Sequence, residues 1–390
     1  MNLADSEICT GCGACLNVCP VNAVNMYADD EGFLQPVIDN AKCIGCSRCT
    51  RACPIVSVIE TPKQIVKSPV CGCTLSDDVW RASSSGGAFT EICSTLESES
   101  PIVFGARFAD NHNVVHDLVD GIKQVDCFRK SKYVQSDIGH TFRQCKEFLE
   151  KGRFVIFSGT PCQIAGLTGF LGNNEYAKLV TLEFICHGVG SPSFFQACLR
   201  EVGNQFGRRV SDYTFRFKSG NRLRKDEHTS FYRFADGTTR EITRDLYNLF
   251  FLNQLCLRKS CMENCRFRRP ERYADITLAD CRGEKLLYPH GDGKNWSVII
   301  ANTEKGAGVI RRLKNRMPLH DYPLELLKEK NPLYFCTTKG NRLRDIVFEK
   351  KKRGEAIFAI ARELNLICPW WKNILRKLRA VSNKITRKGI

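Results

Sequence analysis

The sequence lacks any unbroken stretch of about eighteen apolar residues, the length that a membrane-spanning helix needs. Its longest uncharged run, residues 154–174, is interrupted by one proline and four glycines. The first fifteen residues contain neither the basic segment nor the apolar core of a secretory signal. We therefore expect no transmembrane helix and a cytoplasmic location.

Two nucleotide-binding fingerprints are also missing. The chain has no G-x-G-x-x-G and no Walker A motif, which leaves a Rossmann nicotinamide site and a P-loop nucleotidase without support. Disorder is disfavoured too, because 43% hydrophobic and 26% charged residues are globular values. A chain of 390 residues is long enough for two or three domains.

Acidic residues are in deficit: 42 Asp and Glu stand against 58 Lys and Arg, a formal net charge of +16. A 4Fe-4S centre with four thiolates carries about two negative charges, so three such centres would lower the net charge to about +10. The remaining positive charge suits acidic partners or phosphorylated cofactors.

Cysteine, by contrast, is abundant, with 22 residues. Because the cytosol keeps thiols reduced, metal ligation explains them better than a disulfide framework. Two runs of the form C-x-x-C-x-x-C-x-x-x-C-P repeat at residues 9–20 and 43–54. In this pattern three thiolates of one run and the last thiolate of the other ligate each 4Fe-4S cluster. The expected ligand sets are Cys9, Cys12, Cys15 and Cys53 for one cluster, and Cys43, Cys46, Cys49 and Cys19 for the other.

The segment between the two runs, residues 31–39, indicates a short hairpin strand. A zinc site would use pairs of cysteines separated by a long gap, so the triple runs disfavour zinc and an unligated structural role.

After a linker at residues 61–69, apolar runs alternate with expected helices, which is typical of α/β architecture. The serines and glycines of residues 83–87 open an expected helix and can either bind an anion or form a simple cap and tight turn. Expected strands at residues 154–157 and 179–185 deliver Cys162 and Cys186 at their carboxyl ends, where ligands collect in open α/β sheets.

Cys261 and Cys265 precede another expected strand, residues 274–280. Together with Cys162 and Cys186 they can form a third set of four thiolates. Buried free cysteine is also common, so spacing alone leaves both interpretations open.

Seven segments in order resemble the beta subunits of the coenzyme F-420 hydrogenases and dehydrogenases, over nearly the whole chain to about residue 340. They are SSSGGAF at 83–89, SKYVQSD at 131–137, GTPCQIAGL at 159–167, CHGVGSP at 186–192, the pair Cys261 and Cys265, YADITLAD at 273–280 and GKNWSVIIANTEKG at 293–306.

The resemblance implies a flavoprotein in which FAD lies against a 4Fe-4S cluster held by the four cysteines of the third set. The implied flavin site is Ser85, Gly86, Gly87, Ser131, Lys132 and Tyr133. The chain departs from the family pattern at residues 279–283, which read ADCRG in place of a Gly-Asp-Phe-Trp-Gly type segment, and in the C-x-x-x-C spacing of residues 261–265.

The implied fold class is an α+β ferredoxin-type domain followed by an α/β flavin- and cluster-binding catalytic region. The expected domains are a two-cluster ferredoxin at 1–60, an N-terminal flavin-binding beta-subunit region at 68–172, a C-terminal region at 176–340 and a basic tail at 341–390.

The expected function is oxidoreduction. An acidic redox protein or reduced carrier would supply electrons to 4Fe-4S clusters and FAD, with hydride transfer to or from a deazaflavin coenzyme or another small-molecule acceptor. The alternative is a non-catalytic electron-transfer adaptor without flavin. His187 is interpreted as a proton donor, a partner of the cluster or a structural histidine.

Basic stretches at residues 208–225 and 258–272 carry no nucleic-acid fold signature, so docking of an acidic redox protein is favoured over nucleic-acid binding. Residues 356–390 combine apolar and basic side chains. This combination predicts weak contact with an anionic surface at the inner face of the membrane. The alternatives are a helix packed on the body of the protein and a solvated basic tail.

Overall fold

The N-terminal unit is a small antiparallel hairpin with two short helices. The computed structural model describes residues 3–172, 174–218, 228–263, 265–283 and 293–367. Strand β1 (Val24–Ala28) pairs antiparallel with β2 (Leu34–Ile38), which confirms the expected hairpin. The cysteine runs form loops that lead into α1 (Ala14–Val18) and α2 (Arg48–Arg51). Gly13 caps α1 with a φ of 77°, a conformation that glycine adopts without strain.

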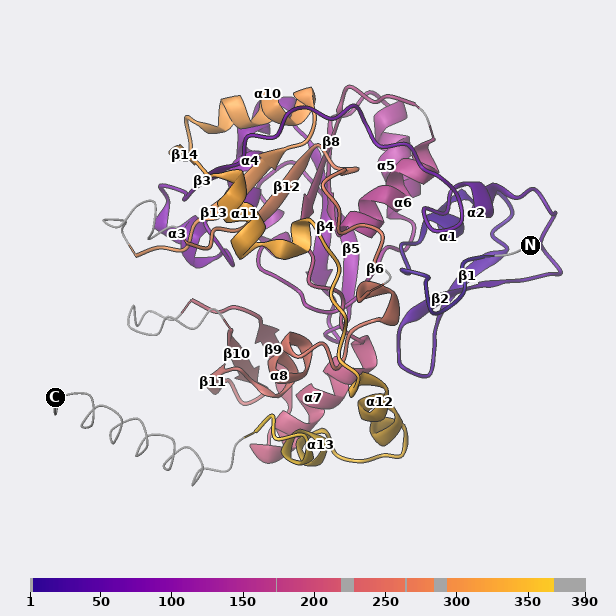
Figure 1. Cartoon of the computed structure of the whole chain (residues 1–390), viewed down its shortest axis with the longest axis vertical. Helices are drawn as coiled ribbons and strands as arrows, with labels where there is room; N and C mark the ends of the chain where they lie inside the picture. Colours follow the sequence, from indigo (N-terminus) through magenta and orange to yellow (C-terminus); the bar gives the residue numbers. More distant parts are fainter. Residues whose placement is uncertain (1–2, 173, 219–227, 264, 284–292, 368–390) are drawn as a thin grey trace.

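A mixed nine-stranded sheet forms the body, in the order β14-β3-β13-β12-β8-β7-β4-β5-β6 (Figure 1). Its centre, from β12 through β8 and β7 to β4, is parallel, and β13, β3 and β14 extend one side by antiparallel pairing. The strands are β3 (Val70–Gly72), β4 (Ile102–Phe108), β5 (Val114–Asp120), β6 (Ser136–Asp137), β7 (Val155–Gly159), β8 (Leu179–Phe184), β12 (Ile276–Asp280), β13 (Ser297–Ala301) and β14 (Leu319–Asp321).

Both faces of the central strands are buried, which explains their nearly continuous apolar sequences. In β7, Val155 and Phe157 join the core beneath α5 (Thr141–Glu150) and α6 (Pro161–Leu171). Ile156 points to the opposite core, beneath α4 (Ala88–Thr95) and α10 (Glu304–Leu313). Shorter elements at the margins are α3 (Asp77–Arg81), η1 (Glu97–Glu99), η2 (Val125–Phe128), α11 (Leu324–Lys330) and η4 (Pro332–Tyr334).

A second, smaller sheet lies below the main sheet in Figure 1, with the order β11-β10-β9. Its aromatic face packs in one core on helices from residues 192–252 and 344–363. The elements are α7 (Pro192–Gln205), β9 (Val210–Thr214), β10 (Thr229–Phe234), β11 (Thr239–Thr243), α8 (Leu246–Leu252), η3 (Lys259–Cys261), α12 (Arg344–Lys352) and α13 (Ile357–Glu363).

Helices α12 and α13 belong to that core, although their residues fall in the segment expected to be a basic tail. Ile357 and Ile360 are almost fully buried, and Phe358 packs against the same cluster. These apolar side chains therefore stabilise the body and are not free to enter a membrane surface. The remaining residues of the tail, 368–390, lie outside the described residues.

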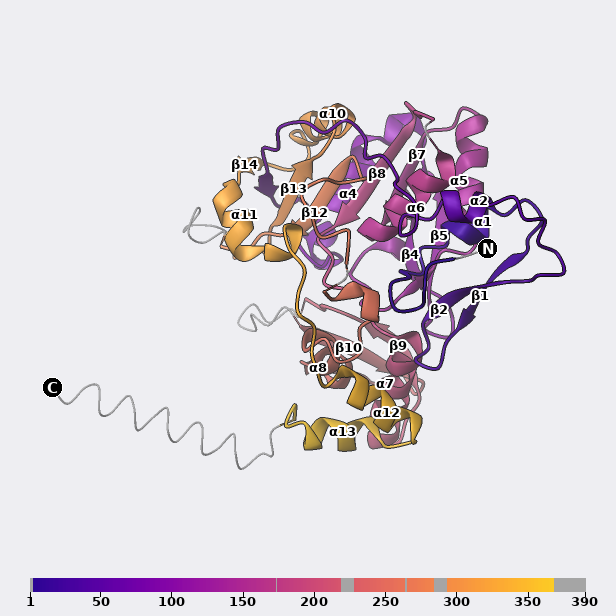
Figure 2. The same ribbon diagram turned by 45° about the vertical axis from the view of Figure 1, so that its right-hand side comes forward.

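The N-terminal unit shares a core with the body (Figure 2). Cys12 and Ala52 pack with Phe142 of α5 and Leu167 of α6. Arg143 donates hydrogen bonds to the carbonyl oxygens of Asn17, Leu16 and Cys19 at 2.6, 3.0 and 2.7 Å. The contact holds the two units in a fixed arrangement.

No helix in the described residues is long and apolar enough to cross a membrane. None of the cysteines that the structure describes forms a disulfide bond.

Candidate functional site

The inner thiol set consists of Cys9, Cys12, Cys15 and Cys53, and all four line one small cavity. Burial raises the pKa of Cys15 to about 12, and the neighbouring thiols Cys9 and Cys53 add to that effect. The backbone amide of Gly11 donates to the Cys9 sulfur at 3.4 Å, the kind of contact that surrounds cluster thiolates. Four converging thiols around a cavity fit a 4Fe-4S cluster.

The outer thiol set consists of Cys19, Cys43, Cys46 and Cys49. Cys19, Cys43 and Cys49 pack in one cluster, and the Ala23 amide donates to the Cys19 sulfur at 3.2 Å. Burial opposes ionisation of Cys19, but backbone amides lower its pKa, with a further contribution from Arg143. Cys43 and Cys46 are partly exposed, and the loop between them is open to solvent at Gly45.

The sheet-edge thiol set consists of Cys162, Cys186, Cys261 and Cys265. Cys162 follows β7 at the start of α6, and Cys186 follows β8. Since β7 and β8 are parallel neighbours, their carboxyl ends deliver both thiols to one edge of the sheet. Cys261 ends η3, which loops back to the same edge.

The sheet-edge thiols influence one another electrostatically. Burial raises the pKa of Cys162, and Cys261 and Cys265 add to the effect. Burial raises the pKa of Cys186 as well, followed by contributions from Cys261 and Cys162. The amide of Gly188 donates to the Cys186 sulfur at 3.3 Å. The structure thus brings together four cysteines that the sequence scatters, with a donor set that fits a 4Fe-4S cluster.

Single-metal geometry is not seen in these sets. Within the described parts of the chain, no group of three or more His, Cys, Asp or Glu side chains is arranged to hold one metal ion. Sulfurs around a lone zinc ion all lie about 2.3 Å from one point, whereas a cluster places iron and sulfide atoms between them.

The inner and sheet-edge sets are neighbours. Cys12 is among the thiols that raise the pKa of Cys162 after burial. The Cys12 sulfur lies only 2.9 Å from the position that a Cβ at Gly166 would occupy. Gly166 belongs to α6, the helix that begins beside Cys162. The inner set therefore lies between the outer set and the edge of the main sheet.

The residues expected to bind flavin are also brought into one region. The Ser131 amide donates to the Ser84 hydroxyl at 2.8 Å, which joins residues 131–133 to the serine-glycine segment. The Lys218 ammonium donates to the Ser85 carbonyl at 2.6 Å and lies over the Trp80 ring at 4.2 Å. Burial lowers the pKa of Lys218 to about 7 and that of Lys132 to about 7.

Two residues of this region, Arg216 and Lys218, were not among the site residues expected from the sequence. Both residues lie in the basic stretch at residues 208–225, where β9 ends at Thr214 and Arg216 adopts a φ of 50°. The Arg216 side chain is thereby buried and contacts both Asp280 oxygens at 2.8–2.9 Å. No local pattern distinguishes this inward turn from a continuing strand.

The two glycines of the expected flavin site are required by the fold itself. A Cβ at Gly86 would lie 2.5 Å from the Gly72 carbonyl oxygen and 2.6 Å from the Ser297 nitrogen. Gly87 caps α4 with a φ of 88°, and a Cβ there would lie 2.9 Å from a Thr74 methyl carbon. Both glycines serve close packing of the helix start on β3 and β13, and the Gly87→Val substitution would strain this turn whether or not flavin binds.

An aromatic path joins the sheet-edge set to this region. The His187 ring, next to Cys186, lies 5.2 Å from the Phe251 ring. Phe251 in turn stacks on Tyr133 at 4.6 Å. Burial and Arg268 lower the pKa of His187 to about 4, and its Nε2 atom has no hydrogen-bond partner. His187 therefore lies between the thiols and a residue of the expected flavin site.

Three arginines of the basic stretch at residues 258–272 are buried and do not belong to the docking surface expected from sequence. Arg258, Arg268 and Arg272 have exposures of 1, 6 and 2%. Their side chains hold the thiol loops and the core, so they cannot meet a partner protein.

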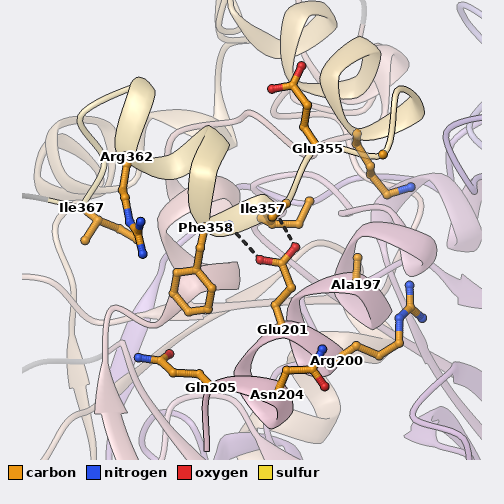
Figure 3. A pocket seen from close by; sticks show the side chains of 13 residues that line it. Ala197, Arg200, Glu201, Asn204, Gln205, Glu355, Ile357, Phe358, Arg362 and Ile367 are labelled. Carbon is orange, nitrogen blue, oxygen red and sulfur yellow. Dashed lines mark hydrogen bonds between the residues drawn. The ribbon is translucent and has the colours of Figure 1, made fainter.

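A separate open pocket of about 800 Å³ lies between α7 and α13 (Figure 3). Glu201 crosses it and accepts hydrogen bonds from the backbone amides of Ile357 and Phe358 at the start of α13. No cysteine and no residue of the expected flavin site lines this pocket.

Two parts of the chain match models of known protein families. Residues 8–56 match the 4Fe-4S dicluster domain. No match exists among the curated proteins. A chain of the xenon-derivatised F420-reducing [NiFe] hydrogenase complex from Methanosarcina barkeri is similar at 15% identity and a TM-score of 0.47, over 76% of this chain and 96% of that one. Residues 152–323 match the model that describes the C-terminal part of the coenzyme F420 hydrogenase/dehydrogenase beta subunit, so this part of the chain is similar to that family and follows a segment that matches a 4Fe-4S dicluster domain.

Proposed function

We propose that this iron-sulfur electron-transfer protein is a flavin-dependent oxidoreductase with three 4Fe-4S clusters. The inner and outer sets would hold two clusters, the sheet-edge set a third, and residues 85–87 and 131–133 would border FAD. Bound clusters supply one-electron steps and bound flavin couples them to two-electron chemistry. One observation carries the proposal: the three thiol sets form a continuous series from the exposed Cys43–Cys46 loop, through the inner set, to the sheet edge.

The region around Lys218 supports the flavin part of the proposal. The Lys218 ammonium and the Arg216 guanidinium lie near each other, with Asp280 as a nearby carboxylate. Tyr133 receives side-chain hydrogen bonds from Ser131 and Arg216. Cations beside aromatic rings suit a group that is both anionic and aromatic, as FAD is.

A non-catalytic adaptor without flavin is the second candidate. It is favoured by Gly86 and Gly87, whose close contacts are made with the protein's own atoms. The serine-glycine motif therefore does not itself require a ligand. The acceptor in the first candidate would be a deazaflavin coenzyme or another small molecule, and we favour neither.

The outer set offers a surface for an acidic electron carrier. Ile44 is 64% exposed beside Cys43 and Cys46. Arg48 and Arg51 are also exposed, and the Arg51 guanidinium donates to the Cys46 carbonyl at 3.2 Å. An apolar rim with two arginines favours a partner with carboxylates around its own redox centre. This surface is a further docking site beside the basic stretches expected from sequence.

The proposal is tested by anaerobic purification and reconstitution, followed by iron analysis and a visible spectrum. We expect about twelve irons and one flavin per chain. Twelve irons without flavin would support the adaptor, and reproducible values near eight would remove the third cluster.

A further inference from the structure

Arg258 and Arg268 are buried cations without a carboxylate partner in the parts of the chain that the structure describes. Arg258 donates to the carbonyl oxygens of Cys9 and Leu34 at 2.7 and 3.0 Å, and its Nη2 atom has no partner. Arg268 donates to the His187 carbonyl at 2.7 Å and to the Thr338 hydroxyl at 3.2 Å, and its Nε atom has no partner.

The other buried arginines differ in this respect. Arg272 pairs with Glu183 at 3.2 Å, and Arg216 pairs with Asp280 at 2.8 Å. Arg344, as buried as Arg258, pairs with the Glu31 carboxylate. Because an isolated charge is costly to bury, the two unpaired guanidinium groups require another source of negative charge.

The positions of Arg258 and Arg268 indicate where this negative charge comes from. Arg258 lies three residues before Cys261 and contacts the loop of the inner set, where its Nη1 atom is 3.0 Å from the place of a Cβ at Gly11. The Cys261 amide donates to the Arg258 carbonyl at 3.0 Å, and Arg268 contacts the carbonyl of His187, the residue that follows Cys186. Carbonyl and hydroxyl oxygens accept some of their hydrogen bonds but do not neutralise their charge.

We infer that Arg258 and Arg268 are the counterions of an anionic 4Fe-4S cluster on the sheet-edge set and that they raise its reduction potential. This inference rests on the proposed function. A cluster with four thiolates carries about two negative charges, and uptake of one electron adds a third. Fixed cations stabilise the more negative, reduced form more strongly than the oxidised form. Arg268, which donates to the carbonyl of the residue after Cys186, therefore favours electron transfer from the inner set toward the sheet edge.

The experiment is an anaerobic potentiometric titration of the cluster-loaded full chain, followed by electron paramagnetic resonance. Arg258→Gln and Arg268→Gln retain side-chain donors and remove the charge, whereas Arg258→Lys and Arg268→Lys retain it. We expect each glutamine variant to lower one of the three potentials by a shift equivalent to about tenfold in the one-electron equilibrium constant, or 59 mV. The lysine variants should retain most of the wild-type value.

Arg344→Gln is the matched control, because it alters a buried arginine that has its own carboxylate partner. It should lower stability and leave the three potentials unchanged. The two arginines are tested independently, so failure of one variant to assemble leaves the other decisive. Unchanged potentials in fully loaded glutamine variants would overturn the inference alone, whereas a wild-type chain with eight irons would overturn the proposed third cluster.

Discussion

The inner and outer thiol sets are built differently from the sheet-edge set. The first two take all eight cysteines from residues 9–53, on loops wound tightly around the sulfurs. The third takes its cysteines from residues 162–265 and depends on the parallel pairing of β7 with β8 and on the loop that returns through η3. Local spacing thus specifies the ferredoxin sites, whereas the assembled sheet specifies the third.

This difference predicts which site is sensitive to distant changes. Loss of one ligand from the sheet-edge set should leave the other two sets intact, because none of their cysteines comes from the body of the chain. Loss of a ligand from the inner set should also have little effect on the sheet-edge set. Cys12 lies near Cys162, but we do not expect the two cysteines to bind the same cluster.

The largest expected effect comes from Cys261→Ala. The substitution removes one of four ligands, so we expect iron to fall from about twelve to about eight per chain. Electron delivery from the ferredoxin sets to bound flavin should become much slower, as followed by stopped-flow absorbance with iron and flavin counted in the same samples. Cys256→Ala is the control, because Cys256 is a fully buried core thiol five residues away. If the Cys261→Ala variant had the wild-type iron content, Cys261 would be an ordinary core residue and not a cluster ligand.

Lys218→Met should have the next largest effect, on flavin content. The substitution keeps most of the apolar stem over Trp80 and removes the ammonium group that bonds to the Ser85 and Trp80 carbonyls. A lost charge-assisted hydrogen bond is worth about 1.5–3 kcal/mol, so FAD affinity should weaken at least about tenfold. Fluorescence titration of the flavin-depleted protein measures this change.

The iron content of Lys218→Met should remain at the wild-type value, and exposed Lys314 provides the matched Lys314→Met control. Equal FAD affinity in the two variants would count against a flavin site beside Lys218. This substitution is a cleaner test than Gly87→Val, which strains the start of α4 directly.

The same contrast explains how far sequence analysis reaches. The spacing of Cys9 to Cys19 identified the ferredoxin ligands, and the apolar runs identified β7, β8 and β12, because these signals are local. Resemblance to a family was needed to select Cys261 as a third-set residue. Burial of Arg258 could not be predicted from the sequence, because a basic stretch is equally compatible with a solvated surface and a buried site. The cysteines near Arg258 come from loops that are distant in sequence.

Gly166→Ala tests the contact between the inner and sheet-edge sets and should have a moderate effect. An alanine in a helix normally gains about 0.5–1 kcal/mol over glycine. Here the added carbon would meet the Cys12 sulfur at 2.9 Å, and overpacking of this kind costs about 1–3 kcal/mol. Gly308→Ala in α10 is the control, because its nearest contact is the flexible Arg311 side chain at 3.6 Å.

Urea unfolding of the cluster-loaded proteins compares the two glycines. We expect Gly308→Ala to be neutral or stabilising and Gly166→Ala to be destabilising. Equal stabilisation by both would show that the inner set has room to move away from α6, and the close contact of the two sites would lose its support.

The smallest expected effect concerns docking at the outer set, in an Arg48→Glu, Arg51→Glu double variant. Both side chains are exposed near Cys46, so reversal of their charge should slow reduction by an acidic ferredoxin several-fold at low salt. The difference should shrink as ionic strength rises, because salt screens charges that are separated by more than about 10 Å at 0.1 M. Stopped-flow rates at several salt concentrations measure both effects, and reduction by dithionite should be unchanged because it needs no protein docking. Arg312→Glu on α10 changes a charge of similar exposure on another element and should leave the rate near wild type. If Arg312→Glu slowed the reaction as strongly as the double variant, the effect would reflect the net charge of the protein. The result would then contradict docking of the electron donor at the outer set.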